Sequence, residues 1–535
     1  MKKVFLIVLL AFFLRIVNVG NIPPSLSWDE VSIGYNAYSI LKTGYDEHHR
    51  FLPLDAFAAY GDYKPPLAIY LTVPSIALLG LNEFSVRLPS VVAGTLAVFL
   101  TYFLVKELFK KSPFTYHVSF ITSFLLAISP WHIQLSRAGF EANIATTLII
   151  FGVWFVLKAR ENRRLLFICW LPFVAAIYTF NSARYLVPFL GLALLVYTKN
   201  TFLLYKKQFV IGIVVSFILL LPILPHLLSK DARLRFTEVN IFTDSSIVQT
   251  SNERIAYDHN LPIGKIFHNR RIAFVRSYLN HFFDHFEPEF LFIHGDGNPK
   301  FSIQDVGELY LVELPFLILG IYWMFAKEKK NAWFLLFWLI AAIIPAATAR
   351  ETPHALRIED SLPTWHLFIA FGIITLVSKF RSINKKKIIV IGIIVFYIAN
   401  FSYYLSNYYS HYAKEYSGEW QYGYREAIRF IQPIKNQYNS IVMTENIGRP
   451  YAYVLFYEQY NPEQFWKTVD ASFDASGFYN VYGFDGYRFV KEGIGEAKSK
   501  TLYILGPKDV PAGIRILKTI TLLNGEPVLV IFDKP

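Results

Sequence analysis

Apolar runs separated by short polar segments dominate this chain. A membrane-spanning helix needs roughly 20 mainly apolar residues, and eleven runs come near that length. They cover residues 4–19, 87–109, 117–130, 142–158, 165–180, 184–198, 209–228, 307–326, 332–348, 363–379 and 388–406. The pattern predicts an α-helical polytopic membrane protein with about eleven transmembrane helices.

Basic residues gather in six clusters beside these runs, around residues 2–3, 106–111, 158–164, 199–207, 327–330 and 379–387. With eleven crossings all six clusters fall on one face, which the positive-inside rule assigns to the cytoplasm. A further apolar run, 66–81, would place the first cluster opposite the other five if it crossed. We therefore predict that 66–81 forms an interfacial or re-entrant helix. The N-terminal run lacks a small-residue cleavage site, so we expect an uncleaved first span with a cytoplasmic N-terminus.

This topology places the loops 20–86 and 229–306 and the tail 407–535 outside the cytoplasm. We assign residues 1–406 to a transmembrane catalytic domain and 407–535 to an extracytoplasmic α/β domain. The tail has strand-like runs at 440–444, 501–505 and 527–532 and a helix-like run at 424–434. The loop 229–306 is too long for a plain connector, so we expect helices within it. We also expect a multi-pass protein of the plasma membrane.

Composition agrees with a membrane protein. The chain has 535 residues, of which 54% are hydrophobic and 17% charged, whereas soluble domains carry about 25% charged residues. The net charge is +12, but the positive residues lie in the clusters between spans, so positive-inside topology explains them without nucleic-acid binding. The single cysteine, Cys169, excludes an intramolecular disulfide.

The first long polar stretch begins with Ser27-Trp28-Asp29-Glu30. Ser-x-x-Glu is a capping box, so Ser27 is expected to cap a helix and Glu30 to reach back to its amide. Neighbouring helical residues point in different directions, and Asp29 therefore stays available for chemistry. We assign Asp29 a catalytic role and Glu30 a supporting one.

Glu141 is a second acidic candidate, at the point where a short outer turn, 131–140, enters the fourth span. An ionisable residue at that depth is costly unless paired, so it is a functional candidate. Arg137 lies four residues earlier, and a helical ion pair between the two is the alternative interpretation.

Several cations are placed to meet a lipid phosphate. Lys64 precedes two prolines, which restrict it to extended backbone, while Arg184 follows Tyr178 at an outer membrane boundary. Arg357 is a weaker candidate, and headgroup snorkelling is the alternative for these cations.

His281 and His285 form a metal-like pair, but nothing near them in the sequence supplies a convincing third ligand. We therefore predict no bound metal there.

These residues resemble those of a known family. An Asp-Glu pair soon after the first span, then Lys64-Pro-Pro-Leu and Arg87-Leu-Pro-Ser, resemble the dolichyl-phosphate-mannose protein mannosyltransferases and the bacterial aminoarabinose lipid A transferases. Both belong to the GT-C superfamily of membrane glycosyltransferases. The resemblance covers residues 1–380 and depends on the order of the motifs together with the topology.

The resemblance implies an inverting glycosyltransferase whose partners are a polyprenyl-phosphate-linked sugar donor, a protein, lipid or glycan acceptor, and membrane lipids. It implies that Asp29 is the catalytic base, that Glu141 matches a second acidic position, and that Lys64 and Arg184 match phosphate-binding positions. Arg137 matches an arginine near the site, and the segment from Tyr178 to Arg184 is similar to the family's segment after the fifth span. The candidate substrate- and phosphate-binding residues are therefore Lys64, Arg137, Tyr178, Arg184 and Arg357. A divalent metal between Asp29 and Glu141 occurs in some GT-C enzymes, but we expect no cofactor because basic residues are available.

Two other classes of function remain open from sequence. A transporter or flippase of lipid-linked sugars would use similar cations, but it would need more polar residues deep in several spans. A non-catalytic scaffold would leave the set of Asp29, Lys64 and Glu141 unexplained.

Overall fold

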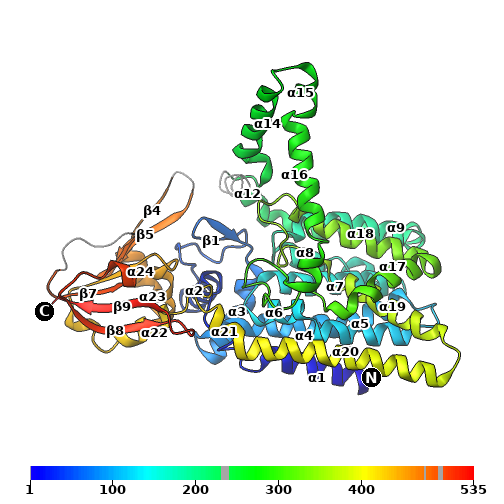
Figure 1. Cartoon of the computed structure of the whole chain (residues 1–535), viewed down its shortest axis with the longest axis horizontal. Coiled ribbons are helices and arrows are strands. Elements are labelled where there is room, and N and C mark those ends of the chain that lie inside the picture. The colour runs from blue at the N-terminus through cyan, green and yellow to red at the C-terminus, as the bar shows by residue number, and fades with distance from the viewer. Residues whose placement is uncertain (1, 230–239, 475–476, 492–497, 535) are drawn as a thin grey trace. The chain divides into compact units, whose positions relative to one another are not determined.

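The computed structural model describes residues 2–229, 240–474, 477–491 and 498–534. The chain divides into two compact units (Figure 1). Unit 1 consists of residues 1–11, 95–134 and 145–402, and unit 2 of residues 12–94, 135–144 and 403–535. Five helices, α1, α4, α6, α7 and α20, contribute residues to both units.

Unit 1 is helical. Each of the eleven apolar runs overlaps with one of the helices α1 (Lys2–Ile16), α4 (Glu83–Leu108), α5 (Thr115–Ile128), α7 (Glu141–Ala159), α8 (Leu171–Ile177), α9 (Ala183–Tyr197), α11 (Lys206–Leu220), α17 (Leu314–Lys327), α18 (Lys329–Ala346), α19 (Thr364–Lys379) and α20 (Ile383–Asn407). Among the described residues six helices, or seven if the bent pair α5 and α6 (Pro130–Arg137) is one span, are long and apolar enough to cross a membrane. The protein is therefore a multi-pass membrane protein, and the count of eleven crossings stays a prediction.

Two glycines bring the helices α17 and α19 into backbone contact. A Cβ atom on Gly320 would lie 1.9 Å from the carbonyl oxygen of Phe368, and one on Gly372 would lie 2.1 Å from that of Phe316. Small residues let membrane helices approach closely, and van der Waals packing then supplies the association energy that the hydrophobic effect cannot supply in lipid.

Three of the six basic clusters come together at one end of unit 1. A cavity of about 530 Å³ there is lined by residues from three of the clusters, with their acidic neighbours: Glu107, Lys110, Lys111, Arg160, Glu161, Glu328 and Lys330. Arg160 and Glu107 form an ion pair of 3.2 Å, and Lys110 pairs with Glu161. Clusters that are far apart in sequence therefore share one end of the helix bundle, as the positive-inside pattern predicts.

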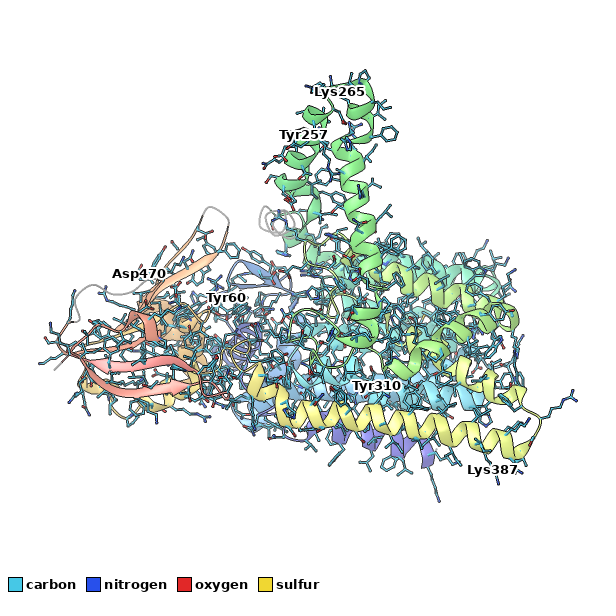
Figure 2. The ribbon with its side chains drawn as sticks, in the orientation of Figure 1. Tyr60, Tyr257, Lys265, Tyr310, Lys387 and Asp470 are labelled. Atoms are coloured by element: carbon cyan, nitrogen blue, oxygen red, sulfur yellow. The ribbon has the colours of Figure 1, made fainter. Side chains whose placement is uncertain are left out.

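The loop 229–306 carries helices, as its length predicts. They are α14 (Ser245–Tyr257), α15 (Pro262–Phe267) and α16 (Arg270–Asp284). The three helices stand out from unit 1, across the direction of α18 (Figure 1). Tyr257 and Lys265 lie toward the far end of this projection (Figure 2).

Unit 2 begins with a short helical and strand segment inside the first loop. It contains α2 (Trp28–Thr43), the hairpin of β1 (Phe57–Ala59) and β2 (Asp62–Lys64), and α3 (Leu67–Leu79). The run 66–81 thus forms a helix of 13 residues, which is short for a span. Its position at a membrane surface stays a prediction.

The tail folds into a seven-stranded mixed sheet of order β4-β5-β6-β3-β7-β9-β8. The strands are β3 (Ser440–Thr444), β4 (Asp470–Phe473), β5 (Tyr479–Phe484), β6 (Tyr487–Val490), β7 (Thr501–Leu505), β8 (Arg515–Thr521) and β9 (Pro527–Asp533). Strand β3 pairs in parallel with β6 and β7, and the helices α22 (Tyr424–Ile431), α23 (Pro450–Tyr457) and α24 (Pro462–Thr468) belong to the same region. The strands predicted at 440–444, 501–505 and 527–532 and the helix at 424–434 are confirmed, apart from small differences at their ends.

The first loop and the sheet share one hydrophobic core. Buried residues of α2, β1 and α3, such as Val31, Phe57 and Ile69, belong to the same cluster as Phe456 and Ile504 of the tail. The apolar face of the loop is therefore buried against the tail. The assignment of 1–406 and 407–535 as separate functional domains stays a prediction.

One local prediction is wrong. The segment 131–140 was expected as a turn, but α6 (Pro130–Arg137) makes most of it helical. Pro130 starts that helix, because a proline is well tolerated in the first turn, where its missing N–H has no intrahelical partner.

The glycine contact between α17 and α19 gives a stability prediction. The substitution Gly320→Ala should lower the apparent melting temperature in detergent markedly, because the new methyl group pushes against the Phe368 carbonyl and the helices must separate. Gly392→Ala in α20 is the matched control, since a Cβ there has nothing within 4 Å. Equal melting temperatures for the two variants would contradict the packing argument.

Candidate active site

The β1–β2 hairpin fixes the position of Lys64. Its two-residue turn, Tyr60 and Gly61, has φ values of +60° and +104°, as a type I′ turn requires. The register pairs Phe57 with Lys64, and Pro65 follows at once. Lys64 is therefore held between a paired strand and a proline that restricts its backbone.

Lys64 bridges the two predicted catalytic acids. Its Nζ lies 2.9 Å from Asp29 Oδ1 and 3.1 Å from Glu141 Oε1. The side chains of Lys64 and Glu141 are 7% and 9% exposed, whereas that of Asp29 is 37% exposed. Of the two acids in the cluster, Glu141 is therefore buried and Asp29 is accessible to solvent.

The charge of Lys64 is stabilised by its neighbours. Burial by itself lowers the pKa of the ammonium group, but the carboxylates of Asp29 and Glu141 outweigh burial and hold the pKa of Lys64 above its ordinary value. Asp62 on the same hairpin acts in the same direction. Lys64 is therefore a permanent cation beside the open carboxylate of Asp29.

Glu30 is a structural hub, as its capping position predicts. The capping box with Ser27 is formed. Glu30 Oε1 accepts hydrogen bonds from Arg87 Nε at 2.8 Å and from the Gly139 amide at 2.9 Å. The carboxylate thus joins the start of α2, the start of α4 and the turn that leads into Glu141, and its side chain is 0% exposed.

The guanidinium of Arg137 also forms its hydrogen bonds within the protein. Its guanidinium is buried and donates to the Tyr408 hydroxyl at 2.9 Å. It also donates to the carbonyl oxygens of Leu14, Val17 and Ile22 at 2.7, 2.8 and 3.0 Å. The alternative ion pair with Glu141 is not formed, because the guanidinium points toward these acceptors while Glu141 binds Lys64.

The other predicted residues lie in unit 1. Tyr178 donates from its hydroxyl to the Leu219 carbonyl at 2.7 Å. Arg184 is in the first turn of α9. The structure thus divides the predicted residues into a cluster in unit 2 and a set of three in unit 1.

Arg357, the third residue of this set, acts on a buried polar group in unit 1. Burial raises the pKa of Asp296 to about 6, while backbone N–H donors and Arg357 oppose that rise. The Asp296 carboxylate accepts from the Ala355 amide at 2.6 Å, and His354 Nδ1 lies 3.6 Å from it.

Arg87 supports the site, although its sequence motif alone indicated no role for it. Its guanidinium is buried and donates to Glu30 and to the carbonyls of Val19 and Pro23 at 2.8 Å. An arginine at the start of an apolar run is a signal in itself, since a charge at that depth needs a partner.

The tail packs directly against the segment that carries Asp29. Tyr453 donates to the Leu26 carbonyl at 2.9 Å, and the Arg449 guanidinium lies 5.4 Å from the centre of the Tyr60 ring. Tyr60 in turn donates to the Trp28 carbonyl at 3.0 Å. The contacts of Tyr453 and Arg449 join residues about 400 positions apart, and no local pattern along the chain indicates them.

A second buried acid lies in the same loop. The Glu47 amide donates to Asn36 at 2.9 Å. Burial raises the pKa of the Glu47 carboxyl to about 7, although the Tyr451 hydroxyl lowers it in part. The charged form of Glu47 is therefore disfavoured inside the core shared by loop and tail.

The described residues hold no group of three or more His, Cys, Asp or Glu side chains placed to bind a metal ion. The imidazoles of His281 and His285 instead face the backbone carbonyls of Ala349 and His281, at 2.8 Å each.

Known proteins resemble this chain in fold along its length and in family sequence over part of it. The chain has a GT-C-like fold, and a family model described as dolichyl-phosphate-mannose-protein mannosyltransferase matches residues 63–226. The resemblance to GT-C glycosyltransferases predicted from sequence is confirmed, and the comparisons give the transporter alternative no support.

The structures of ArnT from Cupriavidus metallidurans, apo and bound to undecaprenyl phosphate, match with TM-scores of 0.53 and 0.52 at 11% and 13% identity, over 99% of this chain and 97% and 98% of theirs. The Archaeoglobus fulgidus oligosaccharyltransferase tethered to an acceptor peptide matches with a TM-score of 0.50 at 13% identity, over 85% of this chain and 62% of its own.

In sequence, the chain is similar to YkcB of Bacillus subtilis (strain 168), a candidate mannosyltransferase. The two are 24% identical over 174 residues, which are 32% of this chain and 22% of YkcB. The match therefore spans about a fifth of that relative.

The buried Glu47 gives a pH prediction. Between the ordinary pKa of 4.5 and about 7, the folded protein keeps a proton on Glu47 that the unfolded chain releases. The free energy of unfolding therefore falls as pH rises through that range, by about 3 kcal/mol in all. The side chain of the Glu47→Gln variant is neutral at every pH, so its free energy of unfolding should not show this fall. The melting-temperature difference between Glu47→Gln and wild type should therefore grow from near zero at pH 4.5 to a plateau above pH 7.

Comparison with the variant at each pH separates Glu47 from neighbouring titrating groups. Glu463→Gln, at an exposed glutamate of α24, is the control and should show no such trend. A difference that is constant with pH would show that Glu47 is ionised in the folded protein throughout.

Proposed function

We propose that this protein is an integral membrane glycosyltransferase that moves a sugar from a polyprenyl-phosphate donor to an acceptor hydroxyl, with inversion at the anomeric carbon. The observation that carries the proposal is the cluster of Asp29, Lys64 and Glu141, held within 3.1 Å contacts in a chain of GT-C-like fold. The family match to residues 63–226 includes Lys64 and Glu141 and supports the same reaction class.

Asp29 is the general base of this reaction. As the acceptor oxygen attacks the anomeric carbon, its proton passes to the Asp29 carboxylate, and the bond from that carbon to the phosphate oxygen breaks. A general base must reach the hydroxyl within hydrogen-bond distance. Asp29 is the most exposed member of the cluster, at 37%, and is therefore the acid that a substrate can approach.

Lys64 stabilises the departing phosphate. A lipid phosphate leaves without a general acid if cations balance its developing negative charge, and that effect is strong where water is excluded. Lys64 is nearly buried and is kept charged by the two acids. Glu141 acts by holding Lys64, while Arg184 and Arg357 of unit 1 are further candidates for contacts with the phosphate.

Glu30, Arg137 and Tyr178 take supporting roles. The hydrogen bonds of Glu30 and Arg137 are made within the protein, so we assign both residues to positioning the segments around the cluster. Tyr178 contacts the neighbouring Leu219 backbone and is assigned to shaping the donor side in unit 1.

The relatives guide the choice of substrates. The ArnT structure was determined with undecaprenyl phosphate, and the archaeal oligosaccharyltransferase with an acceptor peptide. We propose a polyprenyl-phosphate sugar as donor and a protein, lipid or glycan hydroxyl as acceptor. We also propose eleven crossings of the plasma membrane, with the N-terminus in the cytoplasm and the tail 407–535 outside.

The reaction is proposed to need no metal ion. A divalent cation between Asp29 and Glu141 would have to share the place that the Lys64 ammonium takes, within 3.1 Å of both carboxylates. A divalent ion beside the Lys64 ammonium would be repelled by it, so such an ion could bind between the two carboxylates only if the Lys64 side chain moved away.

The variant Asp29→Asn tests the base. Transfer from radiolabelled polyprenyl-phosphate sugars in proteoliposomes should fall by about 10²–10⁴-fold, since an amide cannot accept the proton. Asp470→Asn, at an exposed carboxylate on β4, should retain wild-type transfer. Full activity in a folded Asp29→Asn protein would end the assignment.

Chelation tests the absence of a metal. Transfer by the wild-type protein should continue unchanged after dialysis against EDTA, because Lys64 supplies the positive charge. Loss of transfer that is restored by Mg²⁺ or Mn²⁺ would show that a metal ion takes part.

A further inference from the structure

The helices α14, α15 and α16 expose an unusual amount of apolar surface. We call residues 244–284 the α14–α16 hairpin. Helix α16 has no buried residue at all. At the tip, Leu261, Ile263, Ile266 and Phe267 are 53%, 62%, 62% and 65% exposed. Such a surface is costly in water, and large exposed apolar patches mark interaction sites.

The apolar residues of α16 form one stripe. Ile272, Val275, Leu279 and Phe283 are 46%, 58%, 46% and 61% exposed and follow one another at spacings of three and four residues. At about 100° per residue they share one face. On the same helical wheel Arg271 and Arg276 lie at the two margins of this face, where long basic side chains can reach outward from an apolar environment.

The hairpin is also basic over its outer half. Residues 254–276 contain five Lys or Arg residues and one acid, Asp258. His268 lies 3.4 Å from Asp258. An amphipathic helix with apolar and basic residues on neighbouring faces is typical of a segment that lies in a membrane surface and prefers anionic lipids.

The base of α16 is fixed to the end of a membrane helix. The Tyr278 hydroxyl donates to the Ile344 carbonyl of α18 at 3.2 Å, and His281 Nδ1 lies 2.8 Å from the Ala349 carbonyl just beyond that helix. Ile344 is itself 37% exposed. The apolar stripe of α16 therefore begins beside the outward-facing surface of a candidate span.

The direction of the hairpin agrees with a position along the membrane plane. Within unit 1 it runs across α18 rather than continuing it (Figure 1). Lys387, from the basic cluster at the start of α20, lies near the other end of the bundle, and Lys265 lies far out on the hairpin (Figure 2). A segment that leaves the end of a span sideways follows the interface between lipid and water.

From these observations we infer that the α14–α16 hairpin lies in the membrane–water interface beside the helix bundle, with the stripe Ile272, Val275, Leu279 and Phe283 in the acyl region of an anionic bilayer. A protein partner would have to cover the same stripe. The continuity of the stripe with the exposed side of α18 and the excess of basic residues favour lipid.

Site-directed labelling of the full-length protein in lipid nanodiscs tests this position. The native Cys169 is buried and is replaced by serine, and an environment-sensitive fluorophore is attached to Val275→Cys or Leu279→Cys. Both labels should be quenched several-fold more strongly by doxyl-labelled lipids than by aqueous iodide. Thr250→Cys, on exposed α14, is the matched control and should show the opposite order.

Lipid charge and basic residues provide the second measurement. Doxyl quenching at Leu279→Cys should be stronger in phosphatidylglycerol than in phosphatidylcholine nanodiscs, and Arg271→Gln with Arg276→Gln should reduce that difference. Iodide quenching at positions 275 and 279 equal to that at 250 would overturn the inference. Protection from both quenchers would also overturn it, because it would show that protein covers the stripe.

Discussion

A single buried ion pair holds the candidate site together. Glu30 and Arg87 are fully enclosed and lie 2.8 Å apart. Through the Gly139 amide, 2.9 Å away, the same carboxylate fixes the turn that leads into Glu141. Removing one partner of such a pair leaves an uncompensated charge and costs about 3–5 kcal/mol. Asp29 precedes Glu30 and Glu141 follows Gly139 by two residues, so the Glu30 carboxylate joins the two segments that carry these acids.

The site itself depends on an imbalance of charge and exposure. Two carboxylates share one ammonium group, and Glu141 is closed while Asp29 remains accessible. A buried cation with two acidic neighbours keeps its charge. It can bind a further anion only if one of the two carboxylates gives up its contact, and Asp29 is the accessible one. The arrangement therefore suits a site where a hydroxyl and a phosphate meet, one beside Asp29 and the other beside Lys64.

The tail covers the loop that carries Asp29. Its sheet shares a hydrophobic core with the loop around Asp29, and Arg449 and Tyr453 reach the segment beside Trp28. The loop that carries Asp29 is thus buried by residues that come more than 350 positions later in the chain. In unit 1, the glycine contacts bring α17 and α19 close together. The α14–α16 hairpin extends the exposed apolar surface of unit 1 beyond the candidate spans.

Local patterns in the sequence were enough to predict the helices of the eleven apolar runs, because an apolar run of a given length can be recognised without knowing what it packs against. They were also enough to predict different contacts for Asp29 and Glu30, since a capping box is a local structure. Strands such as Ser440–Thr444, whose apolar runs are continuous, could be predicted in the same way.

Local patterns did not place Lys64 between Asp29 and Glu141, although Lys64 and Glu141 are 77 residues apart and in contact, nor did they pair Arg87 with Glu30. They missed β4, β5, β6 and β8, and they allowed Arg137 to pair with Glu141 when its guanidinium instead binds backbone carbonyls near the end of α1. Those outcomes are decided by which distant segments pack together, and a one-dimensional pattern carries no information on that packing.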